Sequence, residues 1–233
     1  MTDARNPAAI RDDWLILVLV GAVGTGKGTQ AKILSKEFGL PHLASGNLFR
    51  AALAAGTPLG EEARHYMERG ELVPDGITIN MFMDELARPH ASRGAILDGF
   101  PRTVGQSVAL DETLAKMEEK VDRVIFIEVP PEDIIRRVAG RLVCPTDGTT
   151  YHETADPPKV PGICDRDGTP LKQRDDDRPE VVRARLDQQV PPMLGVVDHY
   201  EQLGVATRVD GRQPIEAVTR DILAAVREAR CRW

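Results

Sequence analysis

The sequence has few cysteines, few aromatic residues and no excess of positive charge. Three cysteines among 233 residues argue against a fold held by disulfides and leave metal binding or ordinary packing as their uses. An aromatic content of 4% and a net charge of −6 give no sign of a nucleic-acid-binding surface. An anionic ligand would therefore have to be held by locally clustered Arg and Lys.

Long hydrophobic runs are also missing. The most apolar run, Trp14 to Val20, is far shorter than the roughly 20 residues that a membrane-spanning helix needs. The segment ahead of it, residues 1–13, has acidic residues and lacks an apolar centre, which is untypical of a secretory signal. We therefore interpret residues 1–13 as a loose arm and expect a cytoplasmic protein.

Segments with strand and helix patterns alternate along the rest of the chain. Apolar spacing typical of helices occurs at residues 27–38, 77–87 and 181–190, and again after Pro214. Strands are expected between these helices, at Trp14 to Val20, Pro41 to Ala44, Gly94 to Asp98, Asp122 to Val129 and Val205 to Asp210. This alternation predicts an α/β fold over residues 14–233, with a parallel sheet covered by helices on both faces.

One segment departs from this alternation. Residues 140–177 are rich in Pro, Gly, Asp and Thr, have few large apolar side chains, and contain two of the three cysteines. We interpret this segment as an inserted subdomain.

A glycine-rich loop directly follows the first expected strand. Gly21, Gly26 and Lys27 fit the pattern G-x-x-x-x-G-K, in which backbone N–H groups, a helix N-terminus and a lysine surround phosphate oxygens. Gly28 stands where a Ser or Thr hydroxyl commonly binds magnesium, and Thr29 comes one position later. Magnesium would then be held by nucleotide phosphates and water, with a carboxylate behind them. Asp98, at the end of an expected strand, is the candidate for that carboxylate, acting through water.

Six motifs occur in one order: GAVGTGKGTQ, LASGNLFR, ELVPDG, LDGFPRTVGQ, GRLVCPTDGTTYH and QRDDDRPEVVRARL. Together they closely resemble adenylate kinases of the long-lid bacterial type, from Leu15 to about Leu223. The resemblance implies a P-loop core with a five-stranded parallel sheet and two mobile insertions, one binding AMP at about 44–73 and a lid at about 140–177. It also implies a monomer that converts Mg·ATP and AMP reversibly into two ADP.

The resemblance further implies a role for each motif residue. Phosphoryl transfer depends mainly on alignment and on neutralisation of phosphate charge, so the implied catalytic residues are cations. They are Lys27, Arg102, Arg141, Arg174 and Arg185. The residues implied to bind ATP are Gly21, Gly24, Thr25, Gly26, Lys27, Gly28, Thr29, Arg137, Arg141, Tyr151 and Gln213. Those implied to bind AMP are Ser45, Arg50, Glu71, Leu72, Val73, Gly99, Phe100, Pro101, Arg102, Gln106, Arg174 and Arg185, with the amide of Gln106 at the adenine edge.

Two positions depart from the residues that are frequent in this family. Val23 stands in place of a proline in the loop, and Asn47 in place of an aspartate. Neither change removes a phosphate ligand, so we expect altered kinetics at most.

Four side chains of the lid have the spacing of a metal site. Cys144 and Asp147 form one C-x2-D pair, and Cys164 and Asp167 form another after sixteen intervening residues. In the family this spacing can hold a structural zinc, although usually with three or four cysteines, and thiolate count largely governs the preference for zinc. The sequence leaves two readings open, a zinc site and a metal-free polar network. Cys231 has no partner by spacing.

Three other functions compete with an AMP kinase. A UMP, CMP or GMP kinase would share the loop, but the long lid and Gln106 favour AMP. A nucleotide-dependent switch needs Ser or Thr after the loop lysine, and position 28 is Gly. A zinc-dependent nucleic-acid-binding module would need a basic, aromatic-rich surface around the two C-x2-D pairs, and those segments are acidic.

Overall fold

The computed structural model describes residues 14–69, 71–154, 156–173 and 177–230, and its centre is a parallel sheet. The strands are β1 (Leu15–Val20), β2 (His42–Ala44), β3 (Gly94–Asp98), β4 (Arg123–Glu128) and β7 (Ala206–Asp210), in the order β2-β3-β1-β4-β7. Every neighbouring pair is parallel. This confirms the predicted α/β fold with a five-stranded parallel sheet, and each strand boundary lies within one residue of its prediction.

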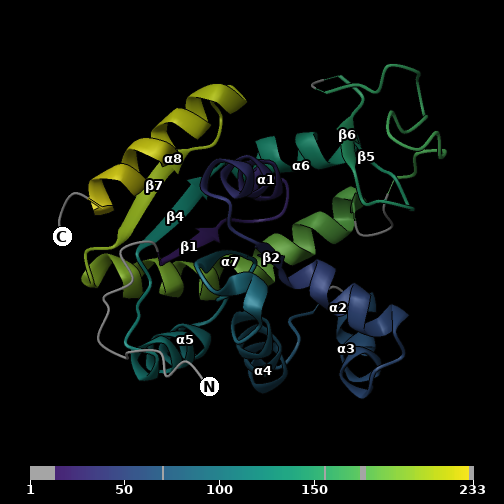
Figure 1. Ribbon diagram of the computed structural model, residues 1–233. Helices are drawn as coiled ribbons and strands as arrows, with labels where there is room; N and C mark the ends of the chain where they lie inside the picture. Colours follow the sequence, from purple (N-terminus) through teal and green to yellow (C-terminus); the bar gives the residue numbers. More distant parts are fainter. Residues whose placement is uncertain (1–13, 70, 155, 174–176, 231–233) are drawn as a thin grey trace, which may run out of the picture.

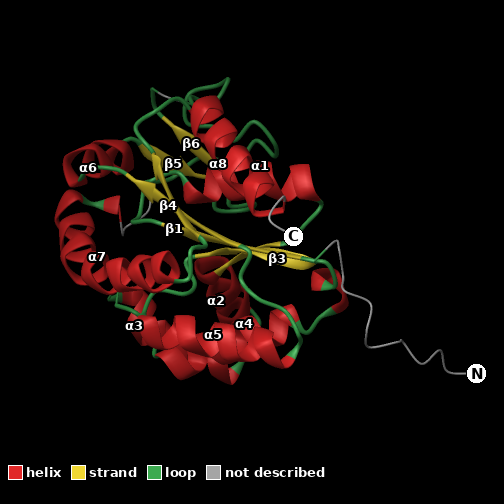
Figure 2. Cartoon of the chain, turned by 90° about the vertical axis from the view of Figure 1, so that its left-hand side faces the viewer, coloured by secondary structure: helices red, strands yellow, loops and turns green. Residues whose placement is uncertain are grey.

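Helices cover both faces of the sheet, as Figure 2 shows. They are α1 (Lys27–Phe38), α2 (Ser45–Ala54), α3 (Pro58–Glu68), α4 (Asp75–Leu86), α5 (Val104–Lys116), α6 (Pro131–Ala139), α7 (Pro179–Gln202) and α8 (Ile215–Arg230), with a 3-10 turn at Pro89–Ala91. Leu15, Leu17 and Leu19 of β1 pack toward α1 and α8, whereas the alternate residues pack toward α4, α5 and α7. Because β1 is buried on both faces, its sequence is an unbroken apolar run.

The loops that follow β1, β2 and β3 meet at one edge of the sheet. Asp98 is the last residue of β3 and is paired in register with Leu19 of β1 and Ala44 of β2. Because parallel strands bring their carboxyl ends together, the glycine-rich loop, the start of α2 and Asp98 become neighbours.

The two segments that the sequence predicts to be insertions lie beyond this edge (Figure 1). One consists of α2 and α3. The other contains the antiparallel strands β5 (Arg141–Val143) and β6 (Thr150–His152), which follow α6. The mobility of both insertions and their exact limits stay predictions.

Helix α7 is longer than its sequence pattern predicts. The pattern ends at residue 190, yet α7 continues through Pro191 and Pro192 to Gln202. Proline disfavours a helix interior, but Val182, Val196 and Tyr200 are buried against neighbouring elements. This packing, from α6 at one end to α5 at the other, offsets the cost of the two prolines.

None of the helices among the described residues is long and apolar enough to cross a membrane. The sequence predictions also concern the arm at 1–13, Arg174 and Cys231. These residues lie outside the part of the chain that the structure describes.

Candidate active site

The glycine-rich loop curls around the carbonyl oxygen of Ala22. Lys27 donates from Nζ to this oxygen at 2.8 Å, and the Thr25 hydroxyl donates to it at 3.0 Å. Gly26 precedes α1 with a φ of 98°, a conformation that side chains disfavour, and it has no side chain with which to cap the helix. The first N–H groups of α1 are therefore left to an anionic ligand.

Val23, which departs from the family pattern, belongs to an apolar cluster beside the lid. It packs with Ala22 against buried residues that include Ile134 and Val138 of α6. At the next position, a Cβ on Gly24 would lie 2.5 Å from a methyl group of Val138. The loop is thus packed against the helix that leads into the lid, which gives Val23 a structural role.

Asp98 lies next to the position where the loop has glycine in place of a hydroxyl residue. A Cβ on Gly28 would be 3.8 Å from Asp98 Oδ2, whereas Thr29 is exposed. The His42 ring donates from Nε2 to the same oxygen at 3.1 Å. Burial alone would raise the pKa of Asp98, but the hydrogen bond from His42 and the charge of Lys27 outweigh it and lower the pKa. The carboxylate is therefore ionised, as a ligand of magnesium-bound water must be.

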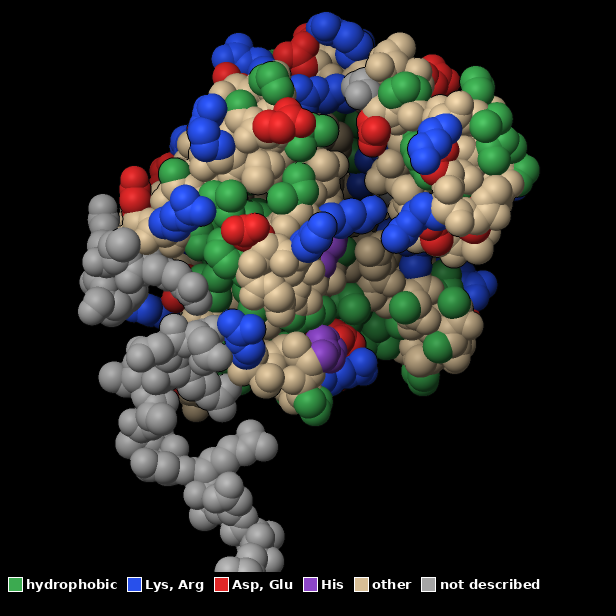
Figure 3. All heavy atoms as spheres, turned by 45° about the horizontal axis from the view of Figure 1, so that its top comes forward, with side chains coloured by type: hydrophobic (Ala, Val, Ile, Leu, Met, Phe, Trp, Pro, Cys, Tyr) green, Lys and Arg blue, Asp and Glu red, His purple; other side chains and the backbone are tan. Residues whose placement is uncertain are grey.

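Lys27 lies at the centre of a group of cations. Loss of hydration within the loop lowers the pKa of Lys27 to about 8, against the opposing effect of Asp98. The charges of Arg102, Arg185 and Arg141 lower it further. In Figure 3, Lys and Arg side chains gather around a hollow in this face of the molecule. The structure thus brings together four of the five predicted catalytic residues, and such a group favours a polyanion.

A pocket opens between α2, α4 and α7 beside these cations. It is lined by Ser45, Gly46, Phe49, Arg50, Met67, Glu71, Leu72, Val73, Thr78, Gly99, Arg102, Gln106, Arg185 and Gln189. Most of the described residues predicted for AMP are in this lining, including Gln106. Phe100 and Pro101 are buried behind it, and the Phe100 ring stacks on Phe82 with centroids 4.3 Å apart.

Sequence reasoning missed five of the residues in this lining: Gly46, Phe49, Met67, Thr78 and Gln189. The spacing of Gln189 and Arg185, four residues apart on α7, carries a signal, because such residues share a helix face. The other four are apolar or small and have no chemical signature.

Two of the three arginines in the pocket lining, Arg102 and Arg50, are held by short-range contacts. Arg102 donates from Nε to the Gly99 carbonyl at 2.8 Å and from Nη2 to the Ser45 hydroxyl at 3.2 Å. Arg50 donates from Nη2 to Asn47 Oδ1 at 2.6 Å. The Asn47 amide therefore orients a guanidinium without neutralising it.

Three other residues predicted for ATP, namely Arg137, Arg141 and Gln213, are not part of the pocket lining. Hydrogen bonds from Arg212 lower the pKa of Asp210, and the charge of Arg137 lowers it further. Gln213 donates from Nε2 to the Asp210 carbonyl at 3.2 Å. Arg141 donates from Nε to the fully buried Asp177 at 2.8 Å, and from Nη2 to its other oxygen. Asp177 was not singled out from the sequence, where it is one of three consecutive aspartates.

The Tyr151 side chain belongs to the interior of the lid. Its hydroxyl accepts a hydrogen bond from the Asp165 N–H at 2.8 Å and lies 3.5 Å from Cys164 Sγ. The contact with Cys164, together with burial, raises the pKa of Tyr151 to about 12. An ATP contact at position 151 would therefore fall to the backbone.

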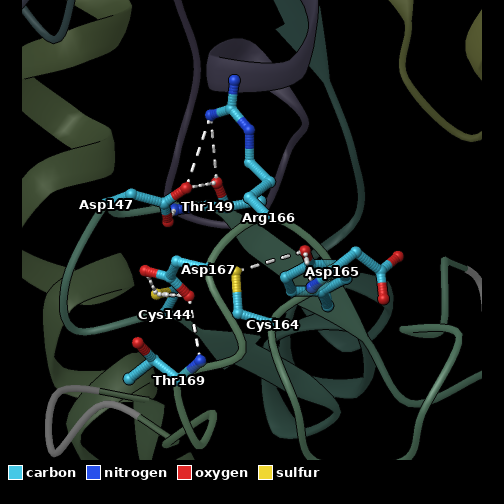
Figure 4. A network of polar contacts seen from close by, with 9 residues as sticks. Cys144, Asp147, Thr149, Cys164, Asp165, Arg166, Asp167 and Thr169 are labelled. Atoms are coloured by element: carbon cyan, nitrogen blue, oxygen red, sulfur yellow. Dashed lines mark hydrogen bonds and ion pairs between the residues drawn. The ribbon is translucent and has the colours of Figure 1, made fainter.

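The two C-x2-D pairs of the lid form matched turns that face each other (Figure 4). The Gly148 N–H donates to the Cys144 carbonyl at 3.0 Å, and Gly168 makes the same bond to Cys164. Ligand atoms of Cys144, Asp147, Cys164 and Asp167 all lie within 4.8 Å of one another.

The charge state of the two carboxylates also suits a cation, whereas burial raises the pKa of the Cys144 thiol. Hydrogen bonds from Thr149 lower the pKa of Asp147 to about 2, and the Thr169 N–H lowers the pKa of Asp167. Two thiols and two ionised carboxylates converging on one point are compatible with a tetrahedral zinc ion.

Comparison with known proteins agrees with this geometry. The family model described as adenylate kinase matches residues 19–205. A protein of Exiguobacterium sibiricum named adenylate kinase is 46% identical over 208 residues, which cover 89% of this chain and 97% of the relative. An adenylate kinase of Staphylococcus aureus is 44% identical over 207 residues, covering 89% and 96%, and one of Staphylococcus epidermidis is equally similar. From the match to the family model and the extent of these similarities, the chain belongs to the adenylate kinase family.

Proposed function

We propose that the protein transfers a phosphoryl group reversibly from Mg·ATP to AMP, giving two ADP. The observation that carries this proposal is the position of Arg102 and Arg185. Both line the pocket between α2, α4 and α7, and the positive charge of each lowers the pKa of Lys27 in the glycine-rich loop. A monophosphate in the pocket and a triphosphate on the loop would therefore meet at one group of cations.

In this proposal, the chain aligns two phosphates and neutralises the charge between them. The loop N–H groups and Lys27 hold the β- and γ-phosphates of ATP, while Arg50 and Arg102 hold the AMP phosphate. Arg141 and Arg185, together with Arg174, surround the transferring group. These fixed charges stabilise the transition state without requiring a covalent intermediate.

Magnesium, when bound with ATP, supplies further charge neutralisation between the β- and γ-phosphates. The ionised Asp98 carboxylate beside Gly28 is suited to orient its water ligands. Asp98 would thereby serve in place of the loop hydroxyl that Gly28 lacks.

We propose that the four lid side chains hold a structural zinc, supported by their mutual distances and by the lowered carboxylate pKa values. The lid has a small apolar cluster of Cys144, Tyr151 and Cys164 with Leu142 and Leu171, so a metal crosslink would add rigidity that packing supplies weakly. We also propose that a single copy is active, since both nucleotide sites come from one chain.

The test is a panel of acceptors with Mg·ATP. We expect rapid ADP formation with AMP and little with UMP, CMP or GMP. ADP formation with UMP but not AMP would overturn the choice of substrate.

Two variants test the assignment of the active site. Lys27→Ala and Arg102→Ala are each expected to lower kcat at least about 100-fold with an unchanged fold, because each removes charge from the transition state. Arg136→Ala is the matched control, since Arg136 is an exposed α6 residue that pairs with Asp133. Near-normal turnover of either test variant would show that the active site is misplaced.

A further inference from the structure

The wall of the pocket contains an amide whose two ends are both held. Gln106 lines the pocket and is 1% exposed. Its Nε2 donates to Asp75 Oδ1 at 2.7 Å, and its Oε1 accepts from the Arg102 N–H at 2.7 Å. Asp75 is the first residue of α4 and belongs to the ELVPDG motif, in which the sequence predictions gave it no role.

These two partners fix which way round the amide lies. A carboxylate only accepts hydrogen bonds, and a backbone N–H only donates them. Rotating the amide by half a turn would set its oxygen against the Asp75 carboxylate and its NH2 group against the Arg102 N–H. Both hydrogen bonds would be replaced by repulsive contacts in a buried place, which is costly.

The fixed orientation matters because purines differ in the order of donor and acceptor along one edge. Adenine presents an amino donor beside a ring-nitrogen acceptor, whereas a 6-oxopurine presents an oxygen acceptor beside a ring N–H donor. After its two protein contacts, Gln106 retains one N–H and one acceptor site. A freely rotating amide could match either base, and a fixed one matches a single order of groups.

We propose that Asp75 is the positioning residue that makes this pocket discriminate 6-aminopurine from 6-oxopurine monophosphates, by fixing the orientation of Gln106. The inference rests on the proposed function, because it concerns the nucleotide that enters the pocket.

Asp75 is itself held in place. Its Oδ2 accepts from the Thr103 hydroxyl at 2.8 Å, and the same hydroxyl accepts from the Gln106 N–H at 3.2 Å. A Cβ on Gly105 would lie 3.2 Å from Asp75 Oδ2, so glycine at this position leaves room for the carboxylate. The first turn of a helix also favours a negative side chain. The carboxylate therefore has little freedom to follow Gln106 if its amide turns.

The test is Asp75→Asn, which keeps the shape but lets the side chain present either oxygen or NH2 to Gln106. Binding of AMP and of inosine monophosphate is measured by calorimetry without ATP, alongside kcat/KM for both. We expect the affinity ratio of AMP to inosine monophosphate to fall about tenfold, because one of the two hydrogen bonds that fix the amide no longer has a preferred direction. Part of the fall should be a real increase in affinity for inosine monophosphate, of at least about threefold.

That increase separates a positioning role from a structural one, since damage to the pocket would weaken both ligands. Asp84→Asn, an exposed substitution on the same helix, is the control and should leave the ratio unchanged. If Asp75→Asn does not fold, Asp75→Ser removes the carboxylate at the same helix start and is measured in the same way.

An unchanged ratio, or an equal loss for both ligands, would overturn the inference while leaving AMP kinase activity intact. Failure of the unaltered protein to phosphorylate AMP would instead overturn the proposed function. The two failures are thus distinguishable.

Discussion

Lys27 is a cation in surroundings that disfavour its charge until a polyanion arrives. Lost hydration and three neighbouring arginines lower its pKa, and the charge of Asp98 opposes them. Phosphate oxygens would reverse this balance by raising the pKa again. The charged form of Lys27 is therefore disfavoured in the free loop and favoured when ATP is bound.

The first prediction concerns the pH dependence of ATP binding. With a pKa of about 8 in the free protein, Lys27 is charged below pH 8 and neutral well above it. Bound phosphates keep it charged, so binding takes up a proton above pH 8 and weakens as the pH rises. We expect the affinity for ATP, measured by calorimetry, to fall about 30-fold between pH 7 and pH 9.5.

Lys27→Arg is the control for this titration, because a guanidinium stays charged throughout the range. Its affinity for ATP should be nearly independent of pH. A similar pH dependence in both proteins would mean that another group titrates.

The second prediction concerns Asn47, which holds Arg50 through a neutral amide. Asn47→Asp would pair the guanidinium with a carboxylate and so reduce the positive charge offered to the AMP phosphate. The pair is exposed and partly screened, so we expect a modest rise of about threefold in the KM for AMP, with kcat unchanged. Steady-state kinetics at low and high salt measure it. The rise should shrink as salt increases, and an equal rise in the KM for ATP would contradict the explanation.

At the scale of elements, the lid is organised by two matched turns and only a small apolar cluster. Each turn places one thiol and one carboxylate at the same point, although the turns are sixteen residues apart. The same side chains can also form hydrogen bonds to one another without metal, since Cys144 Sγ donates to Asp167 Oδ2 at 3.4 Å. A bound zinc ion and a metal-free polar network would each join the two turns, but the zinc ion would stabilise the lid more.

The third prediction is that protein purified without chelator contains about one zinc per chain, measured by elemental analysis. Asp167→Asn should lose most of this metal and lower the temperature at which the lid unfolds, because a structural zinc contributes its binding free energy to folding. Asp165→Asn is the matched control, because Asp165 accepts a hydrogen bond from the Lys159 N–H and is not one of the four converging side chains. Protein free of metal but with an equally stable lid would support the polar network instead.

At the scale of the whole molecule, the five strands form a core with two insertions attached at one edge. The strands are buried between two layers of helices, whereas α2, α3 and the lid strands β5 and β6 gather at one end of the molecule (Figure 1). Ligands that bridge these two segments should therefore change the segments themselves more than the sheet.

The fourth prediction follows for hydrogen exchange measured by mass spectrometry. AMP together with a non-hydrolysable ATP analogue should slow exchange in residues 45–68 and 140–173 far more than in β1, β3 and β4, which are already protected by burial. AMP alone should slow the first segment, and the ATP analogue alone should slow the second. Equal protection of all segments, or none in either insertion, would contradict the prediction that these insertions are mobile.

Local patterns in the sequence determined the strands, the glycine-rich loop and the residue types of the site. An apolar run buried on both faces has few alternatives to a central parallel strand, and G-x-x-x-x-G-K after such a strand specifies both a backbone shape and a charge. For this reason Leu15 to Val20 and Lys27 could be predicted from the residues alone. The packing that carries α7 across Pro191 could not, since it depends on partners distant in the sequence.

Only the tertiary structure decided which side chains hold others in place. Asp75 meets Gln106 across 31 positions, Arg141 meets Asp177 across 36, and His42 meets Asp98 across 56. Nothing in the local sequence distinguishes Asp75 and Asp177 from solvent-exposed acids, because their roles arise from contacts that form when helices and strands pack. The end of a strand singles out Asp98 in the sequence, but it does not reveal the contact with His42. The sequence by itself thus determined the kind of chemistry, and the packing of α4, the lid and β2 determined how the residues that perform it are oriented and charged.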